Sequence, residues 1–191
     1  MCRLTEEQRL KNKMRYFELL SKLNIDLTNL TKYLDMERVD YFNKPSNCYE
    51  NGAYAGGLCS HALKLYDTLI ELSNKYTPGK YTEEDIIKVA LFKDLYKAEL
   101  YESYLKNQKN EFGQWEQVQA YKNKDTRPVF GDISFGSYMI AKKFINLDND
   151  ELVEAICQSS FINNVDGHLI RSQYKLVTLV IIAELIIAHL N

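Results

Sequence analysis

Three ionisable residues stand out because each lies in an otherwise apolar stretch of the chain. His61, in the segment GGLCSH, shares a predicted helix face with Leu58 and Leu65. Asp94, in FKDLYK, belongs to a helical pattern rich in apolar residues, where an acidic side chain is seldom buried unless it is paired. Glu184 interrupts the apolar run VTLVIIAELIIAHL, so we expect it to meet a cation, a hydrogen-bond donor or a pocket. The alternatives are a core histidine satisfied by one hydrogen bond and, for Glu184, a partly exposed stripe.

Residue counting limits the chemistry that these side chains can perform. The chain has only three histidines and no HxH or HExxH spacing, which excludes a histidine-rich metal site and leaves a carboxylate-led one open. It has no Walker-type phosphate loop, no GxSxG elbow and no convincing Cys–His nucleophile pair. The four cysteines show no CxxC spacing, which indicates reduced thiols used as small packing residues. An enzyme would therefore have to rely on the surroundings of His61 and Asp94.

Helices dominate the elements that must position these residues. Residues 41–57 have the composition of a loop, and the segment between Tyr101 and Pro128 contains Gly113 within an alternating pattern that predicts a small β-hairpin. Five helices are expected at about residues 4–23, 27–37, 57–76, 134–145 and 172–189, the first of them capped by Thr5 with Gln8. Two more are expected from their caps. One is capped by Thr82 with Asp85 and runs through Lys93 and Lys97, and the other is capped by Asp148 with Glu151 and runs to about residue 160. The sequence thus predicts a mainly α fold with one β excursion.

Composition indicates one soluble domain over residues 1–191, in which residues 1–37 form an N-terminal helical extension. The net charge of -2 gives no basic footprint, so no nucleic-acid partner is expected. No secretory signal is visible, and the apolar run near residues 176–190 is short and contains Glu184, so no membrane partner is expected either. These features predict a cytoplasmic protein, and a homo-oligomer stays open.

Several segments, taken in order, resemble one family. The run 45–51 (PSNCYEN), the run 55–61 (AGGLCSH) and the run 93–97 (KDLYK) resemble the Pro-Ala-Ser, GGLxxHS and HDxxK motifs of HD-domain phosphohydrolases, in their phage and bacterial branch. Later segments resemble further motifs of that branch: Gly113-Gln-Trp115 followed by 127–132, then 155–159, then 181–184. The resemblance covers about residues 38–190 and implies an HD-domain-like helical bundle with a small β-hairpin insertion.

The departures from the family pattern concern its metal ligands. The family holds its metal with the GGLxxH histidine, the His-Asp pair, further histidines and a late aspartate. By this resemblance, His61 matches the GGLxxH histidine and Asp94 matches the aspartate of the pair, while Lys93 replaces the histidine of the pair. Asn51, Asp132 and Ser159 stand where the branch tends to have histidines, and Glu184 stands for the late aspartate. A lysine charge would repel a metal ion, so we expect no metal, no cofactor and no ordinary HD hydrolysis. Lys97 matches the lysine that lies near substrate phosphate in the family; an ordinary solvated helix lysine is the equal alternative.

The resemblance implies a catalytically inactive HD-fold protein that binds a nucleotide-derived small molecule, as a phage sponge for a bacterial immune signalling nucleotide would. Expected phosphate-facing residues are Lys93, Lys97, Arg127 and Arg171, and expected aromatic walls are Tyr54, Tyr96, Tyr101 and Trp115. The full predicted ligand site comprises His61, Lys93, Asp94, Lys97, Asn51, Tyr54, Tyr96, Tyr101, Asp132, Ser159, Arg171 and Glu184. One alternative is a divergent phosphohydrolase or phosphodiesterase that holds Mg²⁺ or Mn²⁺ with His61, Asp94, Asp132 and Glu184. Another is a protein-interaction module whose cleft is closed by Phe92 and Tyr96.

Overall fold

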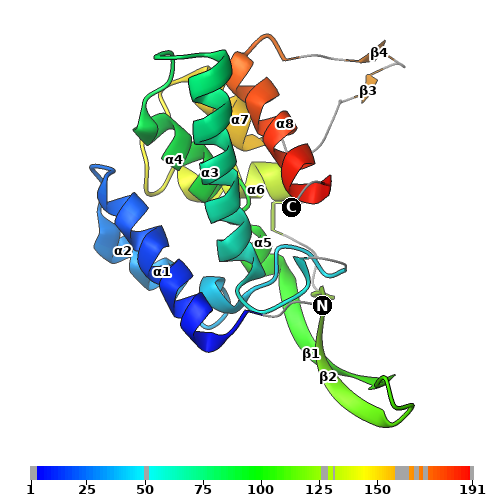
Figure 1. Cartoon of the computed structure of the whole chain (residues 1–191). Coiled ribbons are helices and arrows are strands. Elements are labelled where there is room, and N and C mark those ends of the chain that lie inside the picture. Colours follow the sequence, from blue (N-terminus) through cyan, green and yellow to red (C-terminus); the bar gives the residue numbers. More distant parts are fainter. Residues whose placement is uncertain are drawn as a thin grey trace.

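The chain folds mainly into helices, from which one long β-hairpin projects (Figure 1). This computed structural model describes residues 4–49, 52–125, 129–130, 132–157, 164–165, 168–169 and 172–189. Buried apolar side chains from the N-terminal helices to the C-terminal helix form one hydrophobic cluster. The predicted fold class, mainly α with a small hairpin, is confirmed at this level. Within the described residues, none of the helices combines the length and apolar content needed to cross a bilayer.

Two N-terminal helices begin where the sequence predicts, because local capping sets their starts. Helix α1 (Glu6–Ser21) begins with the capping box of Thr5 and Gln8, and Asp26 caps α2 (Leu27–Leu34). Helix α2 ends three residues earlier than expected. The buried Tyr16 hydroxyl donates to the carbonyl oxygen of Leu91 at 3.0 Å, which ties α1 to the central helices.

Helix α3 (Gly57–Tyr76) is the central element, with the bounds that the sequence predicts. It packs against α4 (Glu83–Phe92) and against the C-terminal helix α8 (Lys175–His189), as Figure 1 shows. The predicted capping box of Thr82 and Asp85 starts α4. Gly56 adopts a left-handed conformation at φ 81° immediately before α3, where a side chain would be strained. The short 3₁₀ turn η1 (Tyr41–Asn43) and the loop after it cover this end of α3.

The expected continuation of α4 through Lys93 and Lys97 is wrong. Helix α4 ends at Phe92, and a tight turn leads into the short helix α5 (Lys97–Leu100). In that turn the backbone N–H groups of Leu95 and Lys97 donate to carbonyl oxygens three residues back, a tighter pattern than the α-helix uses. The turn changes the directions of the side chains of residues 93–97, so their positions cannot be read from one straight helical face.

The predicted hairpin is confirmed as strands β1 (Tyr101–Lys109) and β2 (Trp115–Asn123), paired antiparallel with Lys109 opposite Trp115. Only its base packs on the helices, where Tyr101 and Tyr121 are buried. The outer half projects away from the body of the molecule (Figure 1), and Trp115 is 70% exposed.

The remaining elements are α6 (Ile133–Ala141), α7 (Asp150–Cys157) and the short strands β3 (Asn164–Val165) and β4 (His168–Leu169). Helix α6 ends four residues earlier than expected. The predicted cap of α7 is wrong by one residue, because the N–H of Glu151 donates to Asn149 Oδ1 at 2.8 Å while Asp148 accepts a hydrogen bond from Asn146. The predicted end of this helix, near residue 160, lies outside the described residues.

Candidate ligand site

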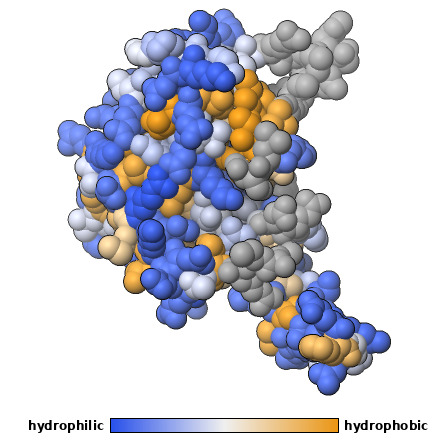
Figure 2. Space-filling model, in the orientation of Figure 1, coloured by the Kyte–Doolittle hydropathy of each residue, from blue (hydrophilic) through white to orange (hydrophobic). Residues whose placement is uncertain are grey.

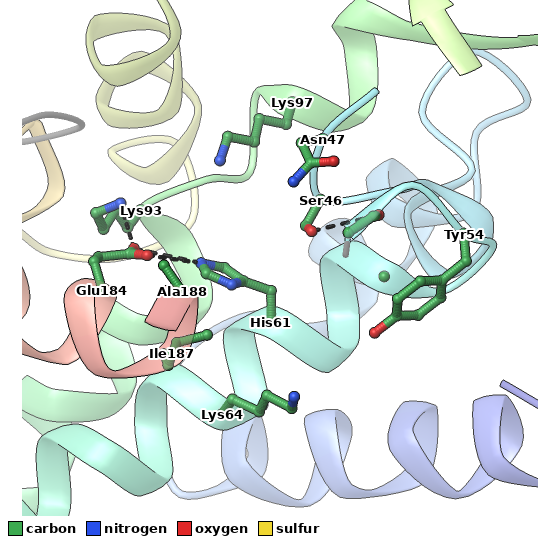
Figure 3. Close-up of a pocket in the computed structure, with 12 residues that line it drawn as sticks. Ser46, Asn47, Tyr54, His61, Lys64, Lys93, Lys97, Glu184, Ile187 and Ala188 are labelled. Atoms are coloured by element: carbon green, nitrogen blue, oxygen red, sulfur yellow. Dashed lines mark hydrogen bonds and ion pairs between the residues drawn. The ribbon is translucent and has the colours of Figure 1, made fainter. Parts of the chain in front are cut away.

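Four segments that are distant in the sequence bring ionisable side chains to one place. His61 comes from the second turn of α3, Lys93 and Asp94 from the turn after α4, Lys97 from the start of α5, and Glu184 from α8. Figure 3 shows His61, Lys93 and Glu184 pointing toward one another. This convergence depends on the packing of α3 against both α4 and α8.

The side chains form a network of opposite charges. Lys93 Nζ lies 2.8 Å from Glu184 Oε1 and 3.6 Å from Asp94 Oδ2. His61 Nε2 lies 3.1 Å from Glu184 Oε2 and 3.5 Å from Asp94 Oδ2, and Lys97 Nζ lies 3.1 Å from Asp94 Oδ1. Two carboxylates are thus shared among two lysines and one histidine.

Burial makes this network strong, because little water screens it. The Lys93 side chain is 3% exposed and that of Asp94 is 7% exposed. Burial by itself lowers the pKa of Lys93, but the carboxylates of Asp94 and Glu184 outweigh that effect and leave the pKa raised. Lys93 is therefore a cation at physiological pH.

The two carboxyl groups show the complementary effect. Burial by itself raises the pKa of Asp94, but the charges of Lys93, Lys97 and His61 hold that pKa well below its usual range. Burial likewise raises the pKa of Glu184, while the hydrogen bond with His61 and the charge of Lys93 lower it to about 2. The network is therefore an ionised cluster, in which Asp94 and Glu184 both carry negative charge.

Asp94 is held by charge more than by hydrogen bonds. Among the described residues, no donor meets hydrogen-bond geometry at either of its buried oxygens, although Lys97, His61 and Lys93 all lie within ion-pair distance. A buried carboxylate in this state depends on the cations around it. If one cation is removed, the free-energy cost of taking the carboxylate out of water is no longer balanced by attraction to that cation. Lys93 is the most deeply buried of these cations.

The cluster fits a metal ion poorly. His61, Asp94 and Glu184 do place three ligand atoms within 4.8 Å of one another. However, a zinc ion bound to both carboxylates would lie about 2.0–2.2 Å from their oxygens, in the region that the Lys93 ammonium occupies. The Lys93 ammonium instead supplies positive charge to both carboxylates.

A pocket of about 290 Å³ opens beside the cluster. Figure 3 shows His61 and Glu184 at one side of it and Tyr54 at the other. Its described lining consists of Ser46, Asn47, Gly52, Tyr54, Gly57, His61, Lys64, Lys93, Lys97, Glu184, Ile187 and Ala188. Three of these side chains are lysines and one is a carboxylate, so the described wall carries an excess of positive charge. The pocket therefore favours an anion.

The loop before α3 forms the opposite wall of the pocket. Its carbonyl groups also accept hydrogen bonds from the first backbone N–H groups of α3. The N–H of Gly57 donates to the carbonyl of Tyr54, and the N–H of Leu58 donates to the carbonyl of Lys44. A Cβ atom at Gly57 would lie 2.6 Å from the carbonyl oxygen of Gly52, so only glycine allows this loop to approach the helix so closely. These two N–H groups of α3 are already bonded and are therefore not available to an anion in the pocket.

The structure brings together half of the predicted site residues: His61, Lys93, Asp94, Lys97, Tyr54 and Glu184. Three of the predicted aromatic walls lie elsewhere. Tyr96 is buried in the core against Gly136, Tyr101 is buried at the base of the hairpin, and Trp115 is exposed at its outer end. Asp132 caps α6 by accepting from the N–H groups of Ser134 and Phe135. Asn51, Ser159 and Arg171, and also Arg127, lie outside the described residues.

Sequence reasoning missed pocket residues on α3 and α8, and it also missed Ser46, Asn47, Gly52 and Gly57 in and next to the loop before α3. Lys64 lines the pocket one helical turn after His61, a spacing that the sequence shows and that could have revealed it. Ile187 and Ala188 also line it, three and four residues after Glu184 on α8. No local signal marks those two, because they resemble every other apolar residue of that helix.

No family model, curated protein or solved structure matches this chain. The resemblance to HD-domain phosphohydrolases therefore stays a prediction, based on the order of its motifs.

Proposed function

We propose that this protein binds a small phosphate-bearing molecule of nucleotide type and does not hydrolyse it. The single observation that carries the proposal is the position of Lys93, whose ammonium contacts Glu184 and Asp94 where a hydrolase would need a metal ion. The pocket beside it keeps open space and three lysines on its described wall.

The pocket supports recognition of an anion of modest size. Glu184 and Asp94 offset Lys93 and Lys97, which leaves the charge of the exposed Lys64 as the excess positive charge of the described wall. A volume of about 290 Å³ lies at the small end of the range for ligand sites, roughly 300–1,000 Å³. Tyr54 supplies an aromatic surface for a base. A mononucleotide or a fragment of similar size fits these limits better than a large cyclic oligonucleotide.

The same network argues against hydrolysis. Hydrolysis of a phosphate ester at neutral pH commonly depends on a metal ion that lowers the pKa of its bound water. Lys93 excludes that ion from the carboxylates, and its own proton is held by the carboxylates beside it. The side chains retained here can bind phosphate charge, but the described residues include no group that would activate water as a metal does.

On the HD resemblance, we propose further that the ligand is a signalling nucleotide of bacterial defence and that binding lowers its free concentration. This step depends on analogy with the phage and bacterial branch, since function does not follow from fold. The pocket chemistry supports only the broader statement of an anionic, nucleotide-like ligand.

Thermal shift with purified protein tests the proposal. The panel contains mononucleotides, cyclic nucleotides and ADP-ribose-type compounds, because a ligand that binds only the native state raises Tm by mass action. Lys97→Gln should weaken binding of a hit at least tenfold, whereas Lys11→Gln, an exposed lysine on α1, should not change it. Mass spectrometry of the bound fraction should return the intact ligand. A cleaved product, or no shift with any member of the panel, would overturn the proposal.

A metal-dependent phosphohydrolase is the second candidate, because three potential ligand atoms do converge. It predicts stoichiometric divalent metal in the purified protein and nucleotide turnover that EDTA stops. The fourth ligand once expected for it, Asp132, instead caps α6. The position of Lys93 makes this candidate the weaker one.

A further inference from the structure

Helix α8 is apolar on the face that it turns away from the core as well as on the face that it buries. Its inner face buries Leu176, Val177, Leu179, Val180 and Ala183. On the opposite side, Leu185 is 41% exposed and Ile181 and Ile182 are only partly buried. Figure 2 shows the resulting apolar surface over this helix. A helix that is apolar all round is usually covered on all sides, whereas the described residues cover the outer side of α8 only in part.

The outward-facing residues form a continuous stripe with the spacing of a helix contact, in which Thr178 and Leu185 are exposed and the others are partly buried. We define the outer stripe as Tyr174, Thr178, Ile181, Ile182 and Leu185. Tyr174, Thr178, Ile181 and Leu185 follow one another at intervals of four, three and four residues, the spacing with which one helix packs along another. Between Lys175 and His189 the only charged residue is Glu184, and that side chain points into the ligand site. The stripe therefore has no charge that a partner would have to desolvate.

A shallow groove of about 320 Å³ runs beside the stripe. It lies between α8 and the end of α3, and Thr178, Ile182 and Tyr76 are among its lining residues. Tyr76 is itself an exposed aromatic side chain. Lys175 also lines the groove. An aromatic residue next to an apolar surface is typical of the centre of a protein interface. The groove widens the contact available to a second helix.

We propose that the outer stripe is a self-association surface, on which α8 of a second copy packs antiparallel. A two-fold axis between Ile181 and Ile182 makes the stripe complementary to itself. Ile181 then faces the partner's Ile182, Thr178 faces the partner's Leu185, and Tyr174 faces the partner's His189. The four central side chains meet one another and Tyr174 meets a histidine at each end, so the same surface serves both copies, which is the condition for an isologous contact.

Charge supports the antiparallel arrangement and the choice of a second copy as the occupant. The same axis places Lys175, at the start of one α8, beside the last turn of the partner's α8. A cation is favoured there, because the carbonyl groups at a helix C-terminus carry partial negative charge. A parallel pair would instead place the two Lys175 ammonium groups together. The last turn also carries Ile187 and Ala188, so the contact would adjoin the ligand pocket.

Sedimentation velocity over about 1 to 300 µM tests the proposal, because dimer content rises with protomer concentration. Wild type should approach twice the mass of the chain. Leu185→Asp should remain monomeric at every concentration and keep its Tm, because the residue is already partly in water. The matched control is Leu105→Asp on the hairpin, another exposed leucine, which should still dimerise. A wild type that stays monomeric at every concentration would overturn the proposal. The stripe would then be covered by another part of the chain or by another protein.

Disulfide trapping tests the register and direction. In the antiparallel pair, position 178 of one copy lies about 10 Å along the helix axis from position 178 of the other, since seven residues rise about 1.5 Å each. A disulfide needs Cα atoms within about 7 Å. Thr178→Cys alone and Leu185→Cys alone should therefore cross-link weakly, and an equimolar mixture should cross-link well above both. Equal cross-linking in all three would contradict the antiparallel contact. Neither assay depends on ligand binding, so the pocket proposal can fail without affecting the outcome.

Discussion

Replacing Lys93 by methionine removes the central cation of the site and keeps a side chain of similar length. Asp94 and Glu184 then lose the ammonium at 3.6 and 2.8 Å, respectively. Asp94 is the more affected, because its buried oxygens accept no hydrogen bond from any described residue. The substitution is therefore a direct measure of how far the network depends on Lys93.

The cost can be bounded from the structure. Removing one partner of a fully buried ion pair destabilises a protein by about 3–5 kcal/mol. Here Glu184 is 23% exposed, and His61 and Lys97 stay beside the carboxylates, so we expect about 2–3 kcal/mol. For a chain of this size each kcal/mol lowers Tm by about 2–4 °C, which gives a fall of about 4–12 °C. Lys11→Met, on the exposed face of α1, should change Tm by no more than about 2 °C.

The same variant tests whether Lys93 stands in the place of a metal. With Lys93→Met, His61, Asp94 and Glu184 lose their competing cation and keep three ligand atoms close together. We expect Zn²⁺ or Mn²⁺ to raise the Tm of the variant and to leave that of wild type unchanged, as followed by differential scanning calorimetry with and without EDTA. If Lys93→Met were as stable as wild type, the reasoning about the network would fail. If wild type bound the metal equally well, the reasoning about exclusion would fail.

Two further predictions concern pH and the loop over the site. Because the pKa values of Asp94 and Glu184 are lowered in the folded state, their contribution to the free energy of unfolding is complete above their ordinary values of 3.8 and 4.5. That contribution is lost progressively as pH falls below those values. The Tm difference between wild type and Lys93→Met should thus shrink between about pH 5 and pH 2, and a constant difference in a pH series would contradict this. Gly57→Ala should destabilise the protein by about 1–3 kcal/mol in urea unfolding, because the added Cβ would meet the carbonyl oxygen of Gly52. Gly79→Ala is the comparison variant. A Cβ at that position meets nothing within 4 Å, so this variant measures the strain of a positive φ alone. Gly57→Ala should also weaken ligand binding, and an unchanged affinity would show that the loop does not shape the pocket.

Sequence patterns predicted the elements whose ends are set by neighbouring residues. The capping boxes of Thr5 with Gln8 and of Thr82 with Asp85 fixed the starts of α1 and α4, because a cap involves only residues three positions apart. The hairpin was predictable for the same reason, since Gly113 and the alternation on both sides of it are local signals. Asp94 and Glu184 were identifiable as unusual, because a carboxylate in an apolar run requires a partner.

Tertiary packing decided what the sequence could not. The end of α4 at Phe92 carries no proline or glycine signal, so the turn that aims Lys93 and Lys97 was predicted as continuing helix. Tyr96 was expected to face a ligand, but it fills the space that Gly136 leaves in the core. An aromatic residue suits a core and a pocket equally well, and only the neighbouring elements decide between them.

The partners of the ionised residues show the same division. That Glu184 needs a cation follows from its apolar surroundings in the sequence. That the cation is Lys93, ninety-one positions away, follows only from the packing of α4 and α8 beside α3. Residue type and local spacing determine which groups cannot remain alone in a protein interior. The choice among distant partners belongs to the tertiary structure, because hydrophobic packing is non-directional and is decided by all the elements together.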